Sequence, residues 1–397
     1  MKKSINNTLI CRISSIGKVQ YTRNYAFLMS LFRHGYRVSA ICPGDLKGSE
    51  LESHIQHYAI PAPNEHFWHG NRIGTTLRAI RQRIKNVRQV ARHLKSVRPD
   101  IIICSEPDSW TLAVWARRHT HCKVIVDLQE FYEDRALSAP KGLQTLAQKM
   151  IRFWMRRLAK QTDLMIHVSS ERQAAYEYLH QPGIIVGNYP RLSDYPVDRS
   201  SPCPRMPTDR IVFLHAGALR PSYASDQLLE ALEIAGAKEP RLLMIVLGGA
   251  VGALDSQRMA RLVTSGLLEI KDQVPRHEVF ECMQKSDVGI SLVLPIDTAH
   301  RLAAPQKLYE YMGACLPVLA SDVPTLRRVI IEHDCGILVE PASPQSIANG
   351  LLAFVNNLKN VRTMGEHGRI AFNHAYNWEQ QETVLCDAID RLAPKQC

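Results

Sequence analysis

The side chains best suited to bind a charged ligand stand together in one short segment, 303–321. Pro305 suits the first turn of a helix, because the amide hydrogen that proline lacks has no partner there. The free amides of that turn, with Lys307 beside them, form a natural site for a diphosphate. Glu310, about one turn further on, is spaced to accept hydrogen bonds from a ribose diol. By spacing alone, an ordinary surface helix with a capping proline explains the segment equally well.

Such a helix must be positioned by a sheet, and short β-branched runs alternate with amphipathic patterns along the chain. This alternation predicts a parallel α/β fold. The expected strands are 8–14, 37–42, 100–105, 123–128, 164–169 and 183–186, and then 211–216, 242–247, 268–270, 287–292, 317–320 and 336–339. The expected helices are 20–33, 73–97, 225–237, 277–284, 306–314, 344–356 and 380–392.

A break in the alternation divides the chain into two halves. Residues 196–207 contain four prolines and show no periodicity, which is typical of a linker between domains. We therefore expect a doubly wound, Rossmann-like domain at 1–195, a second one at 208–376, and a last helix at 377–397 that crosses back to the first domain. Doubly wound sheets bind ligands at the carboxyl ends of their strands, so the chemistry is expected in a cleft between two facing domains.

Composition narrows the class of protein. The 397 residues are 45% hydrophobic and 22% charged, as in folded globular proteins. No run approaches the roughly 20 apolar residues of a membrane span, and the polar residues after Lys3 argue against a secretion signal. We therefore expect a cytoplasmic protein. The ten cysteines and sixteen histidines show no metal-ligand spacing, so we predict buried thiols and no metal.

The net charge of +11 is concentrated in two stretches. Residues 66–99 hold nine basic residues and residues 136–162 hold six, with no acidic residue in either. In the second stretch Phe153 and Trp154 accompany the arginines, and basic amphipathic helices with aromatic residues suit an anionic membrane surface. A solvated basic face is the alternative. Binding to nucleic acid is disfavoured, because no recognised nucleic-acid motif accompanies the charge.

The first segment resembles the donor-site helix of glycosyltransferase family 4 and its GT-B relatives, which often reads P-x-K-L-x-E-Y-M-x-x-G-x-P-V. In that family the glutamate equivalent to Glu310 binds the donor ribose, and nearby backbone amides hold the diphosphate. Cys315 replaces the usual glycine. The residues that match the pattern are Pro305, Lys307, Leu308, Glu310, Tyr311, Met312, Pro317 and Val318.

Weaker matches extend the resemblance over most of the chain. Segment 126–132 resembles a D-x-H-E-x-Y pattern, with Gln129 in place of histidine, and segments 213–219, 246–249 and 274–278 resemble the loops around the nucleotide. The resemblance implies a donor site of Gly17, Gly217, Gly248, Val274, His277, Arg301, Pro305, Gln306, Lys307 and Glu310. It implies Glu130, Gln129, Lys307 and Arg220 as catalytic residues, and Glu106 and Glu130 on the acceptor side. For the two acidic residues, a helix cap or a solvated carboxylate at a strand end is the alternative.

The implied architecture is GT-B, and the implied activity is retaining transfer of a hexose in surface or envelope glycan synthesis. A UDP- or GDP-sugar would be the co-substrate, with no cofactor, and the acceptor would be a glycan or a lipid-linked sugar at the inner face of the cell membrane. Leu302 replaces the first acid of the family's E-x7-E pattern, and Ala218 interrupts a basic pair. A non-catalytic GT-B subunit that binds a glycan or a partner transferase therefore remains the alternative. A sugar-nucleotide epimerase is a further one, although we locate no acid/base residues for it.

Overall fold

The computed structural model describes residues 6–14, 22–47, 49–60, 73–196 and 209–393. The chain divides into two compact units, one of Met1–Val186 with Gln381–Cys397 and one of Gly187–Gln380. The boundaries between the units lie at 186/187 and 380/381. From the sequence we expected a linker at 196–207 and a boundary at 376/377. Apart from residue 196, that predicted linker lies outside the described residues.

The first unit is built on a seven-stranded parallel sheet in the order β3-β2-β1-β4-β5-β6-β7. The strand order reverses at β1 and β4: β2 and β3 are added on one side of β1, and β4 to β7 on the other. Doubly wound sheets bind ligands at such a switch point. Its strands are β1 (Asn6–Ile13), β2 (Tyr36–Cys42), β3 (Gln56–Ala59), β4 (Ile101–Cys104), β5 (Lys123–Leu128), β6 (Leu164–His167) and β7 (Gly183–Ile185).

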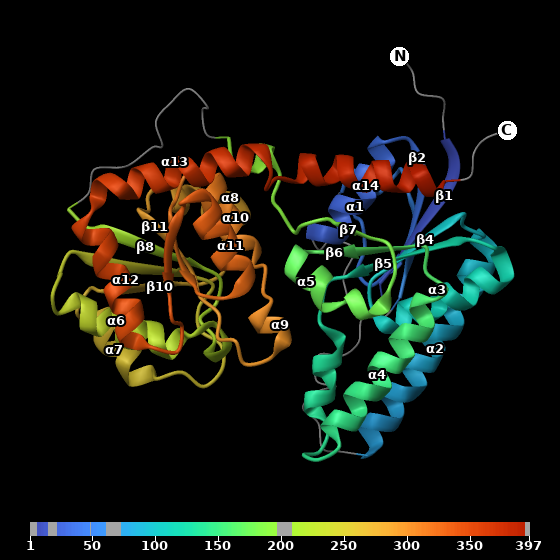
Figure 1. Ribbon diagram of the computed structural model, residues 1–397, viewed down its shortest axis with the longest axis horizontal. Helices are drawn as coiled ribbons and strands as arrows, with labels where there is room; N and C mark the ends of the chain where they lie inside the picture. The colour runs from blue at the N-terminus through green and yellow to red at the C-terminus, as the bar shows by residue number, and fades with distance from the viewer. Residues whose placement is uncertain (1–5, 15–21, 48, 61–72, 197–208, 394–397) are drawn as a thin grey trace. The chain divides into compact units, whose positions relative to one another are not determined.

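Helices flank this sheet on both sides (Figure 1). They are α1 (Thr22–Arg33), α2 (Ile73–Val97), α3 (Pro107–Thr120), α4 (Gln144–Ala159), the short α5 (Ser170–Ala175) and most of α14 (Trp378–Leu392). Strand β4 is buried at all four positions, as expected of a strand covered on both faces. Asp390 of α14 contacts His34 and Tyr36, which ties the C-terminal helix to this unit.

The second unit repeats the plan with six parallel strands in the order β10-β9-β8-β11-β12-β13. The strands are β8 (Ile211–Ala216), β9 (Leu242–Leu247), β10 (Leu268–Lys271), β11 (Val288–Ser291), β12 (Val318–Ser321) and β13 (Gly336–Val339). The helices are α6 (Ser225–Gly236), α7 (Ser256–Thr264), α8 (Arg276–Gln284), α9 (Thr298–Arg301), α10 (Gln306–Gly313), α11 (Pro324–His333), α12 (Pro344–Asn356) and α13 (Leu358–His374).

Each face of this second sheet is covered by its own hydrophobic core. One contains Phe213, Leu228 and Phe354, and the other contains Tyr311, Met312 and Phe372. The parallel α/β class predicted from the sequence is therefore confirmed. The sequence reasoning missed β3, whose residues Gln-His-Tyr-Ala are half-exposed at the sheet edge and form no apolar run.

Two expectations from composition can be compared with the described residues. Seven cysteines there have free thiols, whereas Cys315 is disulfide-bonded, so the prediction of buried thiols was wrong for that residue. In the part of the chain that the structure describes, no helix is both long and apolar enough to span a bilayer.

Candidate functional site

Helix α10 is held against the second sheet by Tyr311, whose ring is fully buried. The Tyr311 hydroxyl accepts a hydrogen bond from the backbone N–H of Ala216 at 2.8 Å and contacts the Leu214 carbonyl at 3.0 Å. Gly289 makes room for the ring, because a Cβ there would lie 2.3 Å from the nearest ring carbon. These contacts hold α10, through its second turn, against the end of β8.

Two glycine loops follow β8 and β9 at the same edge of the sheet. Gly217 and Gly248 both have positive φ, +117° and +126°, which favours glycine. Gly217 donates its N–H to the Leu247 carbonyl at 2.7 Å, and a Cβ on Gly248 would lie 2.9 Å from the Ala218 nitrogen. The two loops therefore pack backbone to backbone. Around the position of a Cβ on Gly217, no heavy atom of the described residues lies within 4 Å, so that backbone is open to a ligand.

Lys307 brings a cation to this edge from the first turn of α10. Its Nζ lies 5.3 Å from the centroid of the Tyr223 ring, which follows Arg220 in the short helix η5 (Pro221–Tyr223). Burial lowers the pKa of Lys307 to about 8, and the charge of Glu310 opposes the shift. Fully buried His215 lies in the same region, and burial, together with Lys307, lowers its pKa well below the usual range. The lysine is thus the cationic member of this pair near neutral pH.

Glu310 lies on α10 next to a cation from α8. Its Oε1 is 3.9 Å from Arg276 Nη2, and that guanidinium also pairs with Asp194 at 3.0 Å. The Tyr195 hydroxyl hydrogen-bonds both Arg276 and Glu310, and its ring is buried against Phe280 and Phe372. Burial raises the pKa of Glu310, and Arg276 counteracts the shift. Glu310 is therefore an oriented carboxylate with a fifth of its side-chain surface accessible.

The other predicted donor-site residues in this unit lie around α10. Pro305 is the N-terminal cap of α10 and Gln306 is its first residue. Val274 packs partly buried against the core. Arg220 and Arg301 are exposed at the ends of their loop and helix. His277 is 75% exposed, so of the residues at the start of α8 it is Arg276 that faces Glu310.

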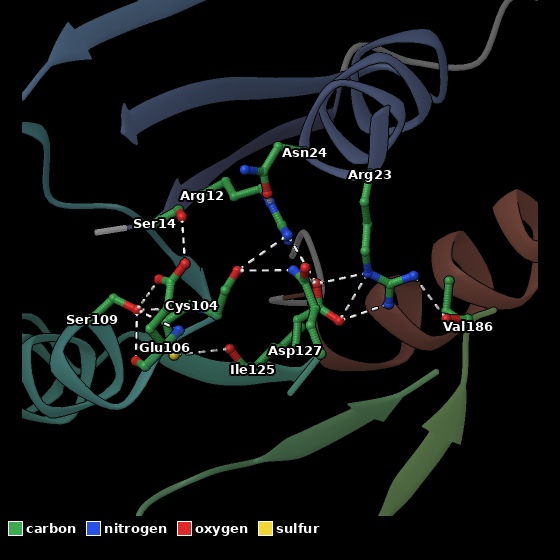
Figure 2. Close-up of polar contacts among 12 residues, drawn as sticks. Arg12, Ser14, Arg23, Asn24, Cys104, Glu106, Ser109, Ile125, Asp127 and Val186 are labelled. Carbon is green, nitrogen blue, oxygen red and sulfur yellow. Dashed lines mark hydrogen bonds and ion pairs between the residues drawn. The ribbon is translucent and has the colours of Figure 1, made fainter. Parts of the chain in front are cut away.

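The carboxyl edge of the first sheet contains a buried ion cluster (Figure 2). Arg12 of β1 and Arg23 of α1 both pair with Asp127 of β5, at 2.9 and 2.7 Å. All three side chains are at most 6% exposed. Burial alone raises the pKa of Asp127, but Arg23 and Arg12 outweigh it and hold the pKa at about 2. We name Arg12, Arg23 and Asp127 the Asp127 cluster.

Three predicted residues surround the Asp127 cluster. Gln129 is half-buried and donates from Nε2 to Asp127 Oδ2 at 2.9 Å. Glu106 follows β4 and accepts a hydrogen bond from Ser14 Oγ at 2.7 Å, which Figure 2 shows beside the cluster. Glu130 is exposed, and its backbone carbonyl accepts a hydrogen bond from the Tyr176 hydroxyl. The edge thus brings Gln129 to the cluster, with Glu106 beside it, and leaves the Glu130 side chain facing solvent.

Sequence reasoning missed Arg12, Arg23, Asp127, Arg276 and Asp194 as site residues. The signal for Arg12 was a charge inside the apolar run Leu9–Ile13, and Arg276 stood next to the residue that was chosen. The partners of Asp127, by contrast, are 104 and 115 residues away in sequence. Gly17 lies outside the described residues. Within the described ranges, no group of three or more His, Cys, Asp or Glu side chains is arranged to hold a metal.

Two protein-family models match this chain, one in each unit. The model of the glycosyl transferases group 1 matches residues 198–371, and that of the glycosyl transferase 4-like domain matches residues 19–182. The chain therefore belongs to the GT-B glycosyltransferases of the family 4 type.

The individual proteins that the chain resembles share little sequence with it over most of its length. An uncharacterized glycosyltransferase of Methanocaldococcus jannaschii is 31% identical over 71 residues, which are 18% of this chain and only 20% of that protein. The sucrose-phosphate synthase of Thermosynechococcus elongatus has a similar structure, with a TM-score of 0.72 at 15% identity over 97% of this chain and 99% of that one. Anabaena HepE, solved in complex with UDP, gives a TM-score of 0.66 at 13% identity over 97% and 100%.

Proposed function

We propose that this protein transfers a hexose from a UDP- or GDP-sugar to a glycan or lipid-linked acceptor, with retention of configuration. The observation that carries the proposal is the edge of the second sheet, where the α10 amides, Lys307 and Glu310 lie beside the Gly217 loop. Amides at a helix start and a lysine match a diphosphate, and an accessible carboxylate matches a ribose diol. Anabaena HepE, which shares the fold, was solved with UDP and with UDP-glucose.

In the proposed reaction, the bond between the anomeric carbon and the diphosphate oxygen breaks and a bond to the acceptor oxygen forms. The acceptor proton passes to the departing diphosphate, so no protein carboxylate has to act as nucleophile. Lys307 and the α10 amides stabilise the negative charge that develops on the leaving group. Arg301 and Arg220, both exposed near this edge, add positive charge that the diphosphate attracts.

A nucleotide screen tests the donor site. Thermal shift with UDP, GDP and their sugars should show stabilisation by one nucleotide family, about 2.7 kcal/mol at 100 times its Kd. Glu310→Ala should weaken it, because the ribose loses its acceptor. Glu332→Ala, at a 55% exposed position near the end of α11, is a matched control and should leave it unchanged. Absence of a shift with every nucleotide would contradict the proposal and favour a non-catalytic subunit.

Transfer itself needs a separate measurement. Donor turnover with the nucleotide that binds, followed by mass spectrometry of added acceptors, distinguishes transfer from hydrolysis. The anomeric configuration of the product, read by NMR, tests retention. Binding without turnover across a panel of glycan and lipid-linked acceptors would support the non-catalytic alternative.

We further propose that the acceptor is reached at the inner face of the cell membrane, through α4. One face of the segment that includes α4 exposes Leu143, Leu146, Met150 and Phe153, each 53–64% accessible. Lys149, Arg152, Arg156 and Arg157 are exposed around them, and the Arg157 guanidinium lies 5.0 Å from the Phe153 ring centroid. Apolar side chains surrounded by cations suit the boundary between acyl chains and anionic headgroups.

Vesicle flotation tests this membrane surface. The protein should float with vesicles that contain anionic lipid and should remain in the soluble fraction with zwitterionic ones. Met150→Glu with Phe153→Glu should abolish flotation, because each glutamate is repelled by the anionic surface. Val263→Glu, at a 49% exposed position of α7, should not. Failure of the wild type to bind anionic vesicles at physiological salt would rule the surface out.

A further inference from the structure

One aromatic ring in the first unit holds two arginines of the same helix. The ring is that of Tyr178, in the short helix η3 (Glu177–Leu179). The guanidinium carbons of Arg152 and Arg156, which are one turn apart on α4, lie 5.2 and 5.3 Å from the centroid of this ring. A guanidinium within about 6 Å of a ring centroid is attracted by the ring, so both side chains are held in place.

The ring is itself anchored by a buried carboxylate. The Tyr178 hydroxyl donates to Glu133 Oε1 at 2.5 Å, and the Glu133 side chain is only 2% exposed. The same oxygen lies 3.7 Å from Arg152 Nε, and in the part of the chain that the structure describes Glu133 is the one carboxylate paired with either arginine. One negative charge therefore faces two positive ones. Because Arg152 is 51% exposed and Arg156 is exposed as well, the excess positive charge is open to an anion from solvent.

A second arginine pair in the same unit lacks this support. Arg88 and Arg92 of α2 have the same spacing and are also exposed. Within the described ranges neither guanidinium packs on an aromatic ring, and Arg92 Nε donates to the Arg88 carbonyl at 3.4 Å. A free arginine side chain loses conformational entropy when it binds a ligand, whereas one that a ring already holds loses less. The α4 pair is therefore preorganised for an anion, and the α2 pair is not.

A phosphate is the anion that fits two guanidinium groups. Each guanidinium directs parallel N–H groups at two oxygens, so a carboxylate fills one such fork, whereas a phosphate has oxygens for both. With about 3.6 residues per turn, the arginine pair lies about a quarter turn around α4 from the exposed side chains of Leu146, Met150 and Phe153. A phosphate between the arginines is thus bordered by apolar side chains, which suit the acyl chain of a lipid.

We propose that Arg152 and Arg156 form a specific site for the phosphate group of a membrane lipid, and that Tyr178 is the positioning residue that holds both guanidinium groups. The inference rests on the membrane surface proposed for α4 and goes beyond it. Charge alone attracts any anionic surface, whereas this site selects phosphate among anions of equal charge.

Vesicles of equal surface charge test this selectivity with the full-length protein. One set contains phosphatidic acid in phosphatidylcholine, and the other contains cholesteryl hemisuccinate, a carboxylate, in phosphatidylcholine at the same zeta potential. The phosphate of phosphatidylcholine is common to both sets and cancels. The wild type should partition at least about fivefold more strongly to phosphatidic acid, because only the phosphate fills both guanidinium forks.

Three variants locate the selectivity. Arg152→Lys with Arg156→Lys keeps the charge and removes both forks, so it should bind the two kinds of vesicle equally. Arg88→Lys with Arg92→Lys is the matched pair on α2 and should keep the preference of the wild type. Tyr178→Leu keeps both arginines but removes the ring, and it should lose most of the preference. Circular dichroism melting shows whether Tyr178→Leu is folded, and the lysine variant, which changes only exposed side chains, tests the site without it.

The outcomes are distinct. If the wild type binds both kinds of vesicle equally, or if the lysine variant on α4 keeps the preference, the site is overturned while charge-driven membrane binding stands. If inorganic phosphate binds as tightly in calorimetry as dihexanoyl phosphatidic acid, the site takes free phosphate and its assignment to a lipid is wrong. If the wild type binds neither kind of vesicle, this inference and the proposed membrane surface both fail. Nucleotide binding and sugar transfer are measured separately, so their failure is distinguishable from each of these results.

Discussion

The carboxyl edges of the two sheets hold similar charges in different states. In the first unit, Arg12, Arg23 and Asp127 are at most 6% exposed and pair with one another at 2.7–2.9 Å. In the second unit, Arg276 and Glu310 are 48% and 19% exposed and lie 3.9 Å apart. Both edges belong to parallel sheets of related strand order. The same strand arrangement therefore carries a closed cluster in one unit and accessible charges in the other.

Burial explains what each edge is able to do. Removing one member of a buried cluster leaves an uncompensated charge in a medium of low dielectric, which is energetically costly. The ion pairs of such a cluster therefore stay intact, and the cluster can orient the side chains next to it. Partly exposed charges change partner at small cost, because water compensates them. The first edge is therefore suited to positioning Gln129, and the second to exchanging internal ion pairs for a charged ligand.

The largest expected effect comes from opening the closed cluster. Asp127→Ala leaves two buried guanidinium groups without their anion and should destabilise the first unit by about 3–5 kcal/mol. Hydrogen exchange of the β1 and β5 amides measures this within that unit, which a single melting curve of a two-unit protein does not.

The matched control for Asp127→Ala is Glu50→Ala. The Arg33–Glu50 pair has both side chains about half exposed, at 51% and 53%. Its loss should change protection by less than about 1 kcal/mol. Similar losses for the two variants would show that burial does not distinguish the Asp127 cluster from a surface pair.

A smaller effect is expected from the anchor of the open edge. Tyr311→Phe removes the acceptor of the Ala216 N–H and should lower the free energy of unfolding of the second unit by about 1–3 kcal/mol. Nucleotide affinity should fall with it, because α10, which carries Lys307 and Glu310, loses a hydrogen bond that holds it against β8. Tyr223→Phe, on a 36% exposed ring, is the control for stability. Hydrogen exchange at increasing denaturant concentration measures the free energy of unfolding of the second unit for both variants. If Tyr311→Phe is as stable as wild type, the buried hydroxyl contributes nothing to stability.

The smallest effect is a pH dependence of the open edge. Nucleotide affinity should fall as the pH rises through about 8, since Lys307 then loses the charge that binds diphosphate. In the free protein the sign for stability is opposite. The folded pKa lies below the unfolded value of 10.5, so the native state releases its proton first and the free energy of unfolding rises between about pH 8 and 10.5.

Calorimetric titration of nucleotide from pH 6.5 to 9.5, a range of about 1.5 units on either side of the lysine pKa, measures this dependence. Lys307→Met should bind more weakly and lose the dependence near pH 8. Lys238→Met, at an exposed position just after the end of α6, should retain it. A wild-type affinity that is constant across pH 8 would show that Lys307 does not meet the diphosphate.

Much of the fold was predictable because its signals are local. Helix α2 and strand β5 have the bounds that their apolar periods predict, Ile73–Val97 and Lys123–Leu128. The spacing of Pro305, Lys307 and Glu310 likewise placed three groups on one short helix. Strand β3 was not predicted, because an edge strand needs no apolar run. The Asp127 cluster was not predicted either, because its members come from three separate elements.

The sequence by itself determined the parallel α/β class and the helix that carries Lys307 and Glu310. It also determined which residue types follow each strand at the carboxyl edges of the two sheets. Those features depend on side-chain period and on neighbours within one turn of helix or one strand. Only the tertiary structure decided which charges are buried together, that Asp127 stays ionised between two arginines, and that the Gln129 side-chain amide donates to Asp127. The reason is physical: a side chain's ionisation and orientation depend on burial and on partners, and folding brings those partners from more than a hundred residues away.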